Sequence, residues 1–188
     1  MKESEKNFLK SLCKYCISKY TISNSGPLIS SLIYQLCKYV DIDVPVIQGV
    51  LRVHINDNYS RSFAHCFNVY KGIVLDASIY QFALTNRAIG HLFPVYVFGN
   101  VPAHIDYIME RILTVDFQTK FSKNFLENVL RNVENNNFEP IKRFDIIEDS
   151  KKENLFYCHW ASIYSWQFTI DNCQLSTVNC QLPKSSSS

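Results

Sequence analysis

The chain has 188 residues, of which 47% are hydrophobic and 19% charged, and 19 Lys and Arg against 17 Asp and Glu give a formal net charge of +2. This content excludes a disordered or collagen-like chain, and the interspersed charges argue against a nucleic-acid binder. The apolar stretches fall short of the about 20 residues that cross a bilayer, and the charged N-terminus lacks the apolar run of a secretory signal. We therefore expect a cytoplasmic protein that binds neither nucleic acid nor membrane. The Lys-, Asn-, Ile- and Tyr-rich composition hints at an AT-rich bacterial or viral genome, and an effector delivered into a host cell is compatible with it.

Two helices are predicted at the N-terminal end. Residues 5–20 carry apolar side chains at spacings of three and four, the pattern of an amphipathic helix. Residues 28–39 have a wide apolar face, which predicts a well-buried helix. The segment Asn24-Ser25-Gly26-Pro27 before it has the chemistry of a helix start, with small polar capping residues followed by proline.

Strands are predicted next. Residues 44–54, 62–70 and 73–79 are rich in β-branched and aromatic residues. Lys71-Gly72 makes a tight connection between the second and third of these strands, and residues 95–98 form a fourth, short one.

The rest of the chain is predicted as an extension of this core. Residues 105–113 and 117–133 are predicted as helices. Residues 156–170 return to the sheet, or the aromatic-rich residues 156–168 offer a partner surface. The sequence thus predicts a single α+β domain over residues 1–184. It has a core at about 12–100, a helical and aromatic-rich extension at about 101–184, and a loose tail at 185–188.

The seven cysteines are Cys13, Cys16, Cys37, Cys66, Cys158, Cys173 and Cys180. An odd number scattered over a chain without a signal peptide predicts reduced thiols rather than a disulfide scaffold. Cys13 and Cys16 have the spacing of half a zinc site, but no second ligand pair follows them. We expect neither a metal nor a cofactor.

The hairpin around Lys71-Gly72 predicts a pair of chemically active side chains. With a two-residue loop, His65 and Asp76 lie on the same face as diagonal neighbours, about 5–8 Å apart between backbones. An Asp carboxylate there accepts the imidazole N–H at about 2.8 Å and fixes the ring, as the orienting acid of a catalytic triad does. The alternative is a core histidine beside a strand-end aspartate.

Ser25-Gly26 opening a helix, the strand 44–49, Phe63-Ala64-His65-Cys66-Phe67 and Gly72-Ile73-Val74-Leu75-Asp76-Ala77-Ser78 together resemble the papain-like superfamily, in its transglutaminase-like branch. The resemblance covers residues 12–80. It implies a nucleophile helix packed on an antiparallel sheet that carries His and Asp, with Ser25, His65 and Asp76 as the triad. It also implies a thiol-dependent acyl-transfer enzyme, a protease, glutamine deamidase or transglutaminase, acting on a protein or peptide amide.

The sequence departs from this family at the nucleophile, where the family has Cys and this chain has Ser25. Three interpretations stay open: an inactivating replacement, a natural serine nucleophile within about 5 Å of His65, or a catalytically inactive binding module on the same fold. The oxyanion donors expected are the backbone at Ser25 and Gly26 and the side chain of Asn24, which is equally a helix cap. The upstream Gln that serves in relatives of papain is missing, because Lys19 and Tyr20 hold that stretch.

Overall fold

The computed structural model describes residues 1–20 and 24–135. The chain divides into two units, Met1–Glu153 and Asn154–Ser188, and all described residues belong to the first. Its elements in chain order are α1 (Glu3–Lys19), α2 (Gly26–Tyr39), β1 (Val46–Asn56), β2 (Tyr59–Tyr70), β3 (Ile73–Asp76), α3 (Gln81–Thr85), the 3₁₀ turn η1 (Arg87–Leu92), β4 (Val97–Phe98), β5 (Ile105–Ile112), the 3₁₀ turn η2 (Val115–Phe117) and α4 (Lys123–Glu134). The described unit is therefore a mixed α+β structure, as the sequence predicted.

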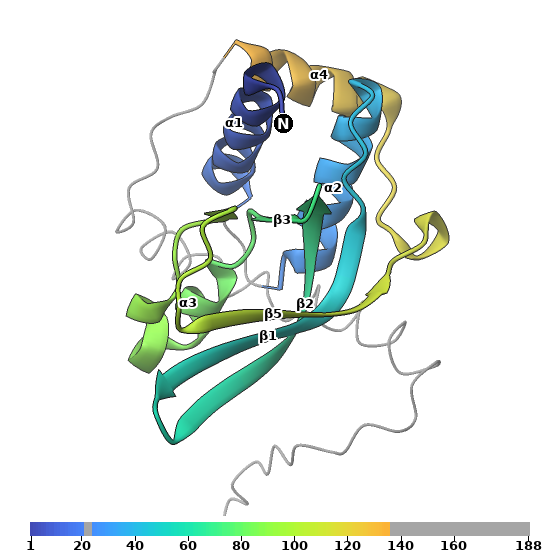
Figure 1. Cartoon of the computed structure of the whole chain (residues 1–188). Helices are drawn as coiled ribbons and strands as arrows, with labels where there is room; N and C mark the ends of the chain where they lie inside the picture. Colours follow the sequence, from blue (N-terminus) through green and yellow to red (C-terminus); the bar gives the residue numbers. More distant parts are fainter. Residues whose placement is uncertain (21–23, 136–188) are drawn as a thin grey trace, which may run out of the picture. The chain divides into compact units, whose positions relative to one another are not determined.

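The five strands form one antiparallel sheet in the order β4-β3-β2-β1-β5 (Figure 1). The predicted two-residue connection between β2 and β3 is present, and Lys71 and Gly72 both take positive φ angles, 50° and 78°. The mirror-image turns of tight hairpins use such angles. β3 pairs with β2 only as far as Asn68. The part of β2 that holds His65 therefore has a partner strand, β1, on one side only.

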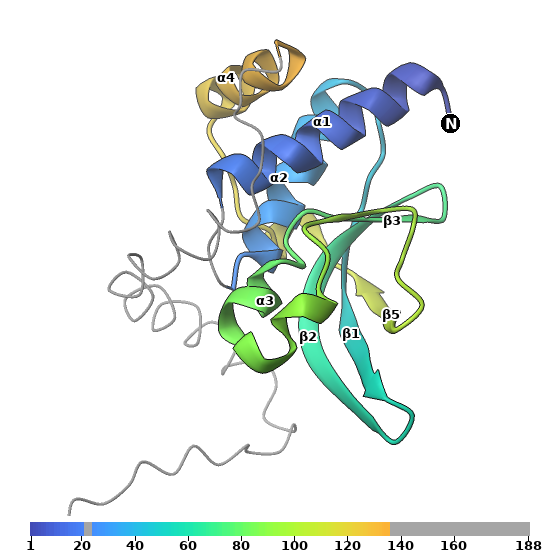
Figure 2. The same ribbon diagram turned by 90° about the vertical axis from the view of Figure 1, so that its left-hand side faces the viewer.

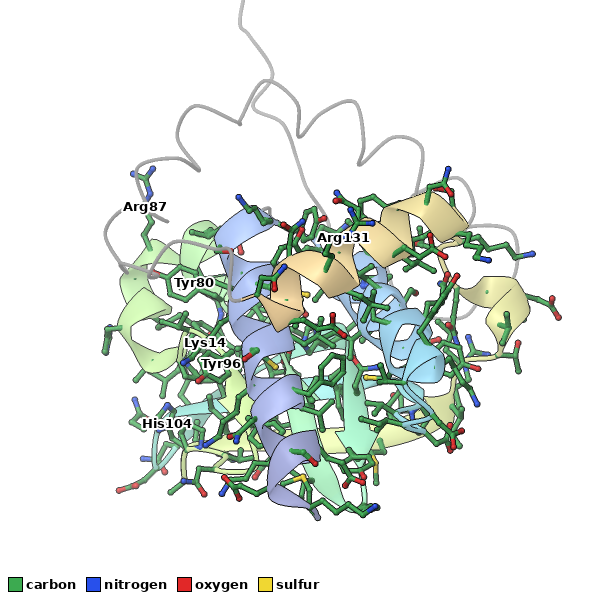
Figure 3. The ribbon with its side chains drawn as sticks, turned by 90° about the horizontal axis from the view of Figure 1, so that it is seen from above. Lys14, Tyr80, Arg87, Tyr96, His104 and Arg131 are labelled. Atoms are coloured by element: carbon green, nitrogen blue, oxygen red, sulfur yellow. The ribbon has the colours of Figure 1, made fainter. Side chains whose placement is uncertain are left out.

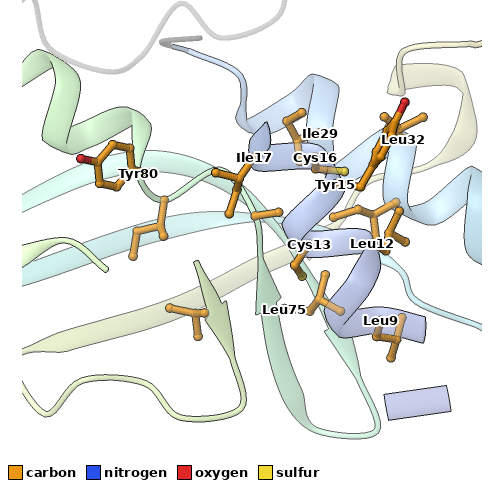
Figure 4. Close-up of a cluster of buried hydrophobic side chains, with 14 of the residues drawn as sticks. Leu9, Leu12, Cys13, Tyr15, Cys16, Ile17, Ile29, Leu32, Leu75 and Tyr80 are labelled. Carbon is orange, nitrogen blue, oxygen red and sulfur yellow. The ribbon is translucent and has the colours of Figure 1, made fainter. Parts of the chain in front are cut away.

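Helices α1 and α2 cover one face of the sheet (Figures 1 and 2). The buried side chains of α1 pack among those of α2 and against Leu75 of β3 (Figure 4). A buried amide fixes α2 on the sheet, because Asn68 Nδ2 donates to the Ser30 carbonyl oxygen at 3.0 Å. Lys14 lies on the outer side of α1 (Figure 3). The packing of α1 on α2 and the Asn68–Ser30 hydrogen bond set the position of the α2 N-terminus relative to β2.

The segment with α3 and η1 packs against apolar side chains of the β1–β2 hairpin, among them Leu51, Val53 and Phe63 (Figure 2). The Phe63 ring of β2 meets the Phe82 ring of α3 at 4.7 Å between centroids and the Phe93 ring at 6.0 Å. Aromatic pairs at these separations are favourable beyond their buried area. This cluster positions α3 directly after the end of β3, beside His65.

The helix predicted over 105–113 is wrong, because β5 occupies Ile105–Ile112 and pairs with β1. Met109, Glu110 and Arg111 favour a helix locally, but the open edge of β1, the burial of Ile105 and the half-buried position of Tyr107 outweigh that preference. Consequently the sheet extends beyond the core predicted from the sequence. The helix predicted over 117–133 begins later, at Lys123, where the Ser122 hydroxyl caps it by accepting from the Phe125 N–H.

Among residues 1–20 and 24–135, no helix is both long enough and apolar enough to cross a membrane. The predicted strand or partner surface at residues 156–170 and the tail at 185–188 lie outside the described residues.

Candidate active site

His65 and Asp76 form a buried hydrogen-bonded pair at the centre of the described unit. The distance between His65 Nε2 and Asp76 Oδ2 is 2.7 Å, and the two side chains are 1% and 0% exposed. The expected contact between them is therefore present. A carboxylate is only an acceptor, so Nε2–H donates and, in the neutral ring, Nδ1 is left as the acceptor. This is the arrangement of a general base held by an acid.

Asp76 receives three further hydrogen bonds, which the sequence did not predict. Oδ1 accepts from the Ser78 backbone N–H and from its hydroxyl, each at 2.9 Å. Oδ2 also accepts from the Tyr107 hydroxyl at 2.8 Å. Burial by itself raises the pKa of the Asp76 carboxyl, but the His65 charge and these donors outweigh it, so the pKa lies below its ordinary value. The carboxylate is therefore kept ionised although it is fully buried.

Aromatic rings surround the imidazole of His65. The ring of Phe82 meets it edge-on at 5.1 Å between centroids, Phe67 stacks on it at 6.1 Å, and Tyr107 lies at 6.5 Å. The same surroundings raise the pKa of the Tyr107 hydroxyl well above its ordinary value, first through burial and then through the Asp76 charge. The base and its partner thus lie in a dry environment, where electrostatic interactions are strong.

The second nitrogen of His65 faces two elements. Nδ1 is 3.3 Å from Nε2 of Gln81, the first residue of α3, whose amide donates to it. On the other element, a β-carbon at Gly26 would lie 3.1 Å from Nδ1 and 3.3 Å from the carbonyl oxygen of Cys66. Only a residue without a side chain fits there unless the imidazole gives way by a few tenths of an ångström. The first residue of α2 therefore lies directly against the base.

Ser25 is the N-cap residue of α2 and is 3% exposed, but its side chain makes no capping hydrogen bond. It precedes the residue whose β-carbon position faces His65. Asn24, the residue before this cap, is exposed and takes a left-handed φ of 56°. The structure thus gathers Ser25, Gly26, His65 and Asp76 around one helix end. Within that group, residue 26 faces Nδ1.

The four described cysteines are Cys13, Cys16, Cys37 and Cys66, and all are free and buried. Burial raises the thiol pKa of every one of them, to about 12 at Cys37 and to about 11 at Cys66. A nucleophilic cysteine needs the opposite shift. Within the described ranges, no three His, Cys, Asp or Glu side chains are grouped as metal ligands.

The sequence did not identify Ser78, Gln81 and Tyr107 as residues of the site. Ser78 carried a weak signal, since it follows Asp76 by two positions, where a side chain and backbone can bond to the same carboxylate. Tyr107 carried none, because its segment was predicted as a helix and reaches Asp76 only through the pairing of β5 with β1.

Comparison of the chain with protein-family models, with curated proteins and with solved structures finds no match.

Proposed function

We propose that the described unit is an acyl-transfer domain with a papain-like core of the transglutaminase-like branch, built to act on a protein or peptide amide. The observation that carries the proposal is the orientation of His65. One ring nitrogen bonds to the buried carboxylate of Asp76 at 2.7 Å, and the other faces the N-terminus of α2. A helix N-terminus lowers the pKa of a thiol and stabilises a developing oxyanion.

The reaction proceeds in two steps. Nδ1 of His65 takes the proton of a nucleophile at the α2 N-terminus, which forms a bond to the amide carbon while the carbonyl π pair moves to oxygen. When the carbonyl re-forms, the C–N bond breaks and His65 returns the proton to the leaving amine. Water or a second amine then releases the acyl group by the same steps. Asp76 holds the ring and stabilises its charged form throughout.

The chain lacks the thiol for this chemistry at the expected place. The residue that faces Nδ1 is Gly26, and the adjacent hydroxyl of Ser25 is a far weaker nucleophile than a thiolate. We therefore propose that the centre is impaired or silent as the sequence stands, and that a cysteine at the helix end restores it.

A second candidate function is a binding module on the same fold. The observation in its favour is the close contact between His65 and Gly26, a residue that has no side chain to act as a nucleophile. In this case the His65–Asp76 pair is structural, and it ties β2 to β3 without chemistry.

The test introduces a cysteine at each of the two positions, Gly26→Cys and Ser25→Cys, and measures iodoacetamide alkylation over a pH series with peptide mass spectrometry. We expect the Gly26→Cys thiol to react rapidly at pH 6–7, because a helix end and an imidazolium lower a thiol pKa by about two units or more. Adding His65→Ala should remove most of that reactivity. Ser25→Cys covers the case that Gly26→Cys does not fold.

The matched control is Ser122→Cys, which places a thiol at the N-cap of α4, a helix end with no histidine among its hydrogen-bond partners. If the new thiols at both site positions react no faster than this control, the acyl-transfer proposal is wrong and the binding module is favoured. In the unmodified chain, labelling of Ser25 by a fluorophosphonate would instead identify a working serine nucleophile.

A further inference from the structure

We propose that Gln81 is the side-chain oxyanion donor of this centre, supplied from downstream of the nucleophile helix rather than from upstream of it. The inference rests on the proposed acyl-transfer function and names one further catalytic residue for it. In relatives of papain a glutamine before the nucleophile supplies this amide, and here that stretch holds Lys19 and Tyr20.

The position of the Gln81 amide supports this role. Its Nε2 is 3.3 Å from His65 Nδ1, and a β-carbon at residue 26 would be 3.1 Å from the same atom. The amide and the nucleophile position therefore lie around one nitrogen, on the side of the imidazole away from Asp76. We infer that a carbonyl attacked from residue 26 develops its charge within reach of this amide.

The burial of Gln81 also fits a preorganised donor. The residue is only 6% exposed, and it is the first residue of α3, the next element after the strand that ends with Asp76. The Phe63–Phe82 contact fixes that helix on the sheet. A donor held in a dry site stabilises an oxyanion more than a solvated one does, because it need not reorganise during the reaction.

The Gln81 amide donates a hydrogen bond to two partners in succession. Before reaction it donates to the single lone pair of Nδ1, which keeps the proton on Nε2, and it must release this pair for Nδ1 to take the nucleophile's proton. Once Nδ1 has accepted the nucleophile's proton, it is itself a donor and no longer accepts from the amide. The amide then donates to the oxyanion, together with an N–H of the first turn of α2 that has no intrahelical partner.

The test compares two reactions of the Gly26→Cys thiol at pH 9, where the thiol is ionised. With p-nitrophenyl acetate, the thiolate forms a bond to the carbonyl carbon, the π pair moves to oxygen, and its return expels p-nitrophenolate. With iodoacetamide, the thiolate displaces iodide at a saturated carbon and no oxyanion forms. Only the first reaction needs an oxyanion donor.

We expect Gln81→Leu and Gln81→Ala to lower the rate of ester acylation by about 100-fold and to change alkylation by less than about 3-fold. Gln35→Ala is the control, since the Gln35 amide donates to the Thr119 carbonyl and not to the site. Equal losses in both reactions would overturn the inference and assign Gln81 a structural role. Unchanged acylation would overturn it too. If the Gly26→Cys and Ser25→Cys thiols both react only as a free thiol does, the proposed function itself fails.

Discussion

Asp76 holds a negative charge at a fully buried position because every part of its carboxylate is occupied by a donor. His65 and Tyr107 share one oxygen, and Ser78 donates twice to the other. A buried charge without partners costs several kcal/mol, roughly, whereas a fully hydrogen-bonded one is tolerated. The hydrogen bonds from Ser78 and Tyr107 therefore determine whether the acid can hold His65 in place.

Tyr107→Phe should lower the free energy of unfolding by about 1.5–3 kcal/mol, because a hydrogen bond to a charged group is lost in a buried site. It should also raise the pKa of Asp76 toward its ordinary value. Urea unfolding at pH 7 measures the first effect. Tyr59→Phe is the control, since Tyr59 is 53% exposed and its change should stay within about 0.5 kcal/mol. Equal effects of the two changes would show that the bond to Asp76 contributes nothing.

The pKa of Asp76 predicts an acid dependence of stability. A carboxyl whose pKa is lower in the folded state stabilises it above the unfolded value, about 3.9, and the effect disappears as the pH falls through the folded value. Asp76→Asn should therefore be less stable than the unchanged chain at pH 7, and the difference should shrink below about pH 4. Urea midpoints between pH 2.5 and 7 measure it, with the exposed Asp57→Asn as control. A constant difference across this range would contradict the lowered pKa.

At the scale of elements, β1 and β5 pair closely because Gly49 has no side chain. A β-carbon at this residue would lie 2.0 Å from the Ile108 carbonyl oxygen, at the place where the register between the two strands shifts. Since Tyr107 reaches the site from β5, the closeness of this pairing decides the hydrogen bonding of Asp76.

Gly49→Ala should therefore cost at least about 3 kcal/mol of stability, at the upper end of the range for overpacked positions, because two backbones must separate. Gly72→Ala is the comparison: it has open space around it but a positive φ of 78°, so the strain should cost about 1–2 kcal/mol. Urea unfolding ranks the two. A smaller loss at Gly49 than at Gly72 would show that β5 adapts to the added methyl group.

At the scale of the whole molecule, the four described cysteines report on global unfolding. They lie at α1, α2 and β2, and all are at most 5% exposed. With a pKa near 11, fewer than about one Cys66 thiol in a hundred is ionised at pH 8. Thiols of this kind react mainly when the structure opens.

We expect iodoacetamide at pH 8 to leave Cys13, Cys16, Cys37 and Cys66 unmodified in the folded protein and to modify them in 8 M urea, which peptide mass spectrometry resolves. The Ser122→Cys thiol serves as the accessible reference, because Ser122 is exposed. Rapid native modification of Cys66 would mean that β2 opens locally near His65.

Local patterns in the sequence predicted much of the site. Helix-start residues before a wide apolar face, β-branched runs and a two-residue turn predicted α2, β1, β2 and β3, and the alternation of side chains along the hairpin predicted that His65 and Asp76 meet. These patterns did not predict which residue of the α2 N-terminus faces His65. Ser25 and Gly26 are neighbours in sequence, and only the packing of α2 against β2 brings the β-carbon position of Gly26 to Nδ1 of His65.

The sequence by itself thus determined the helices and strands whose hydrophobic period is strong, and the pairing across one short hairpin, because both depend on residues close together in the chain. The tertiary structure alone decided that residues 105–112 form a strand, that Tyr107 completes the bonding of Asp76, and that Gln81 meets the far nitrogen of His65. Each of these depends on partners far apart in the chain, 16 residues for Gln81 and His65, 31 for Tyr107 and Asp76, and more for β5 and β1. Burial and open sheet edges rather than local preference set their approach.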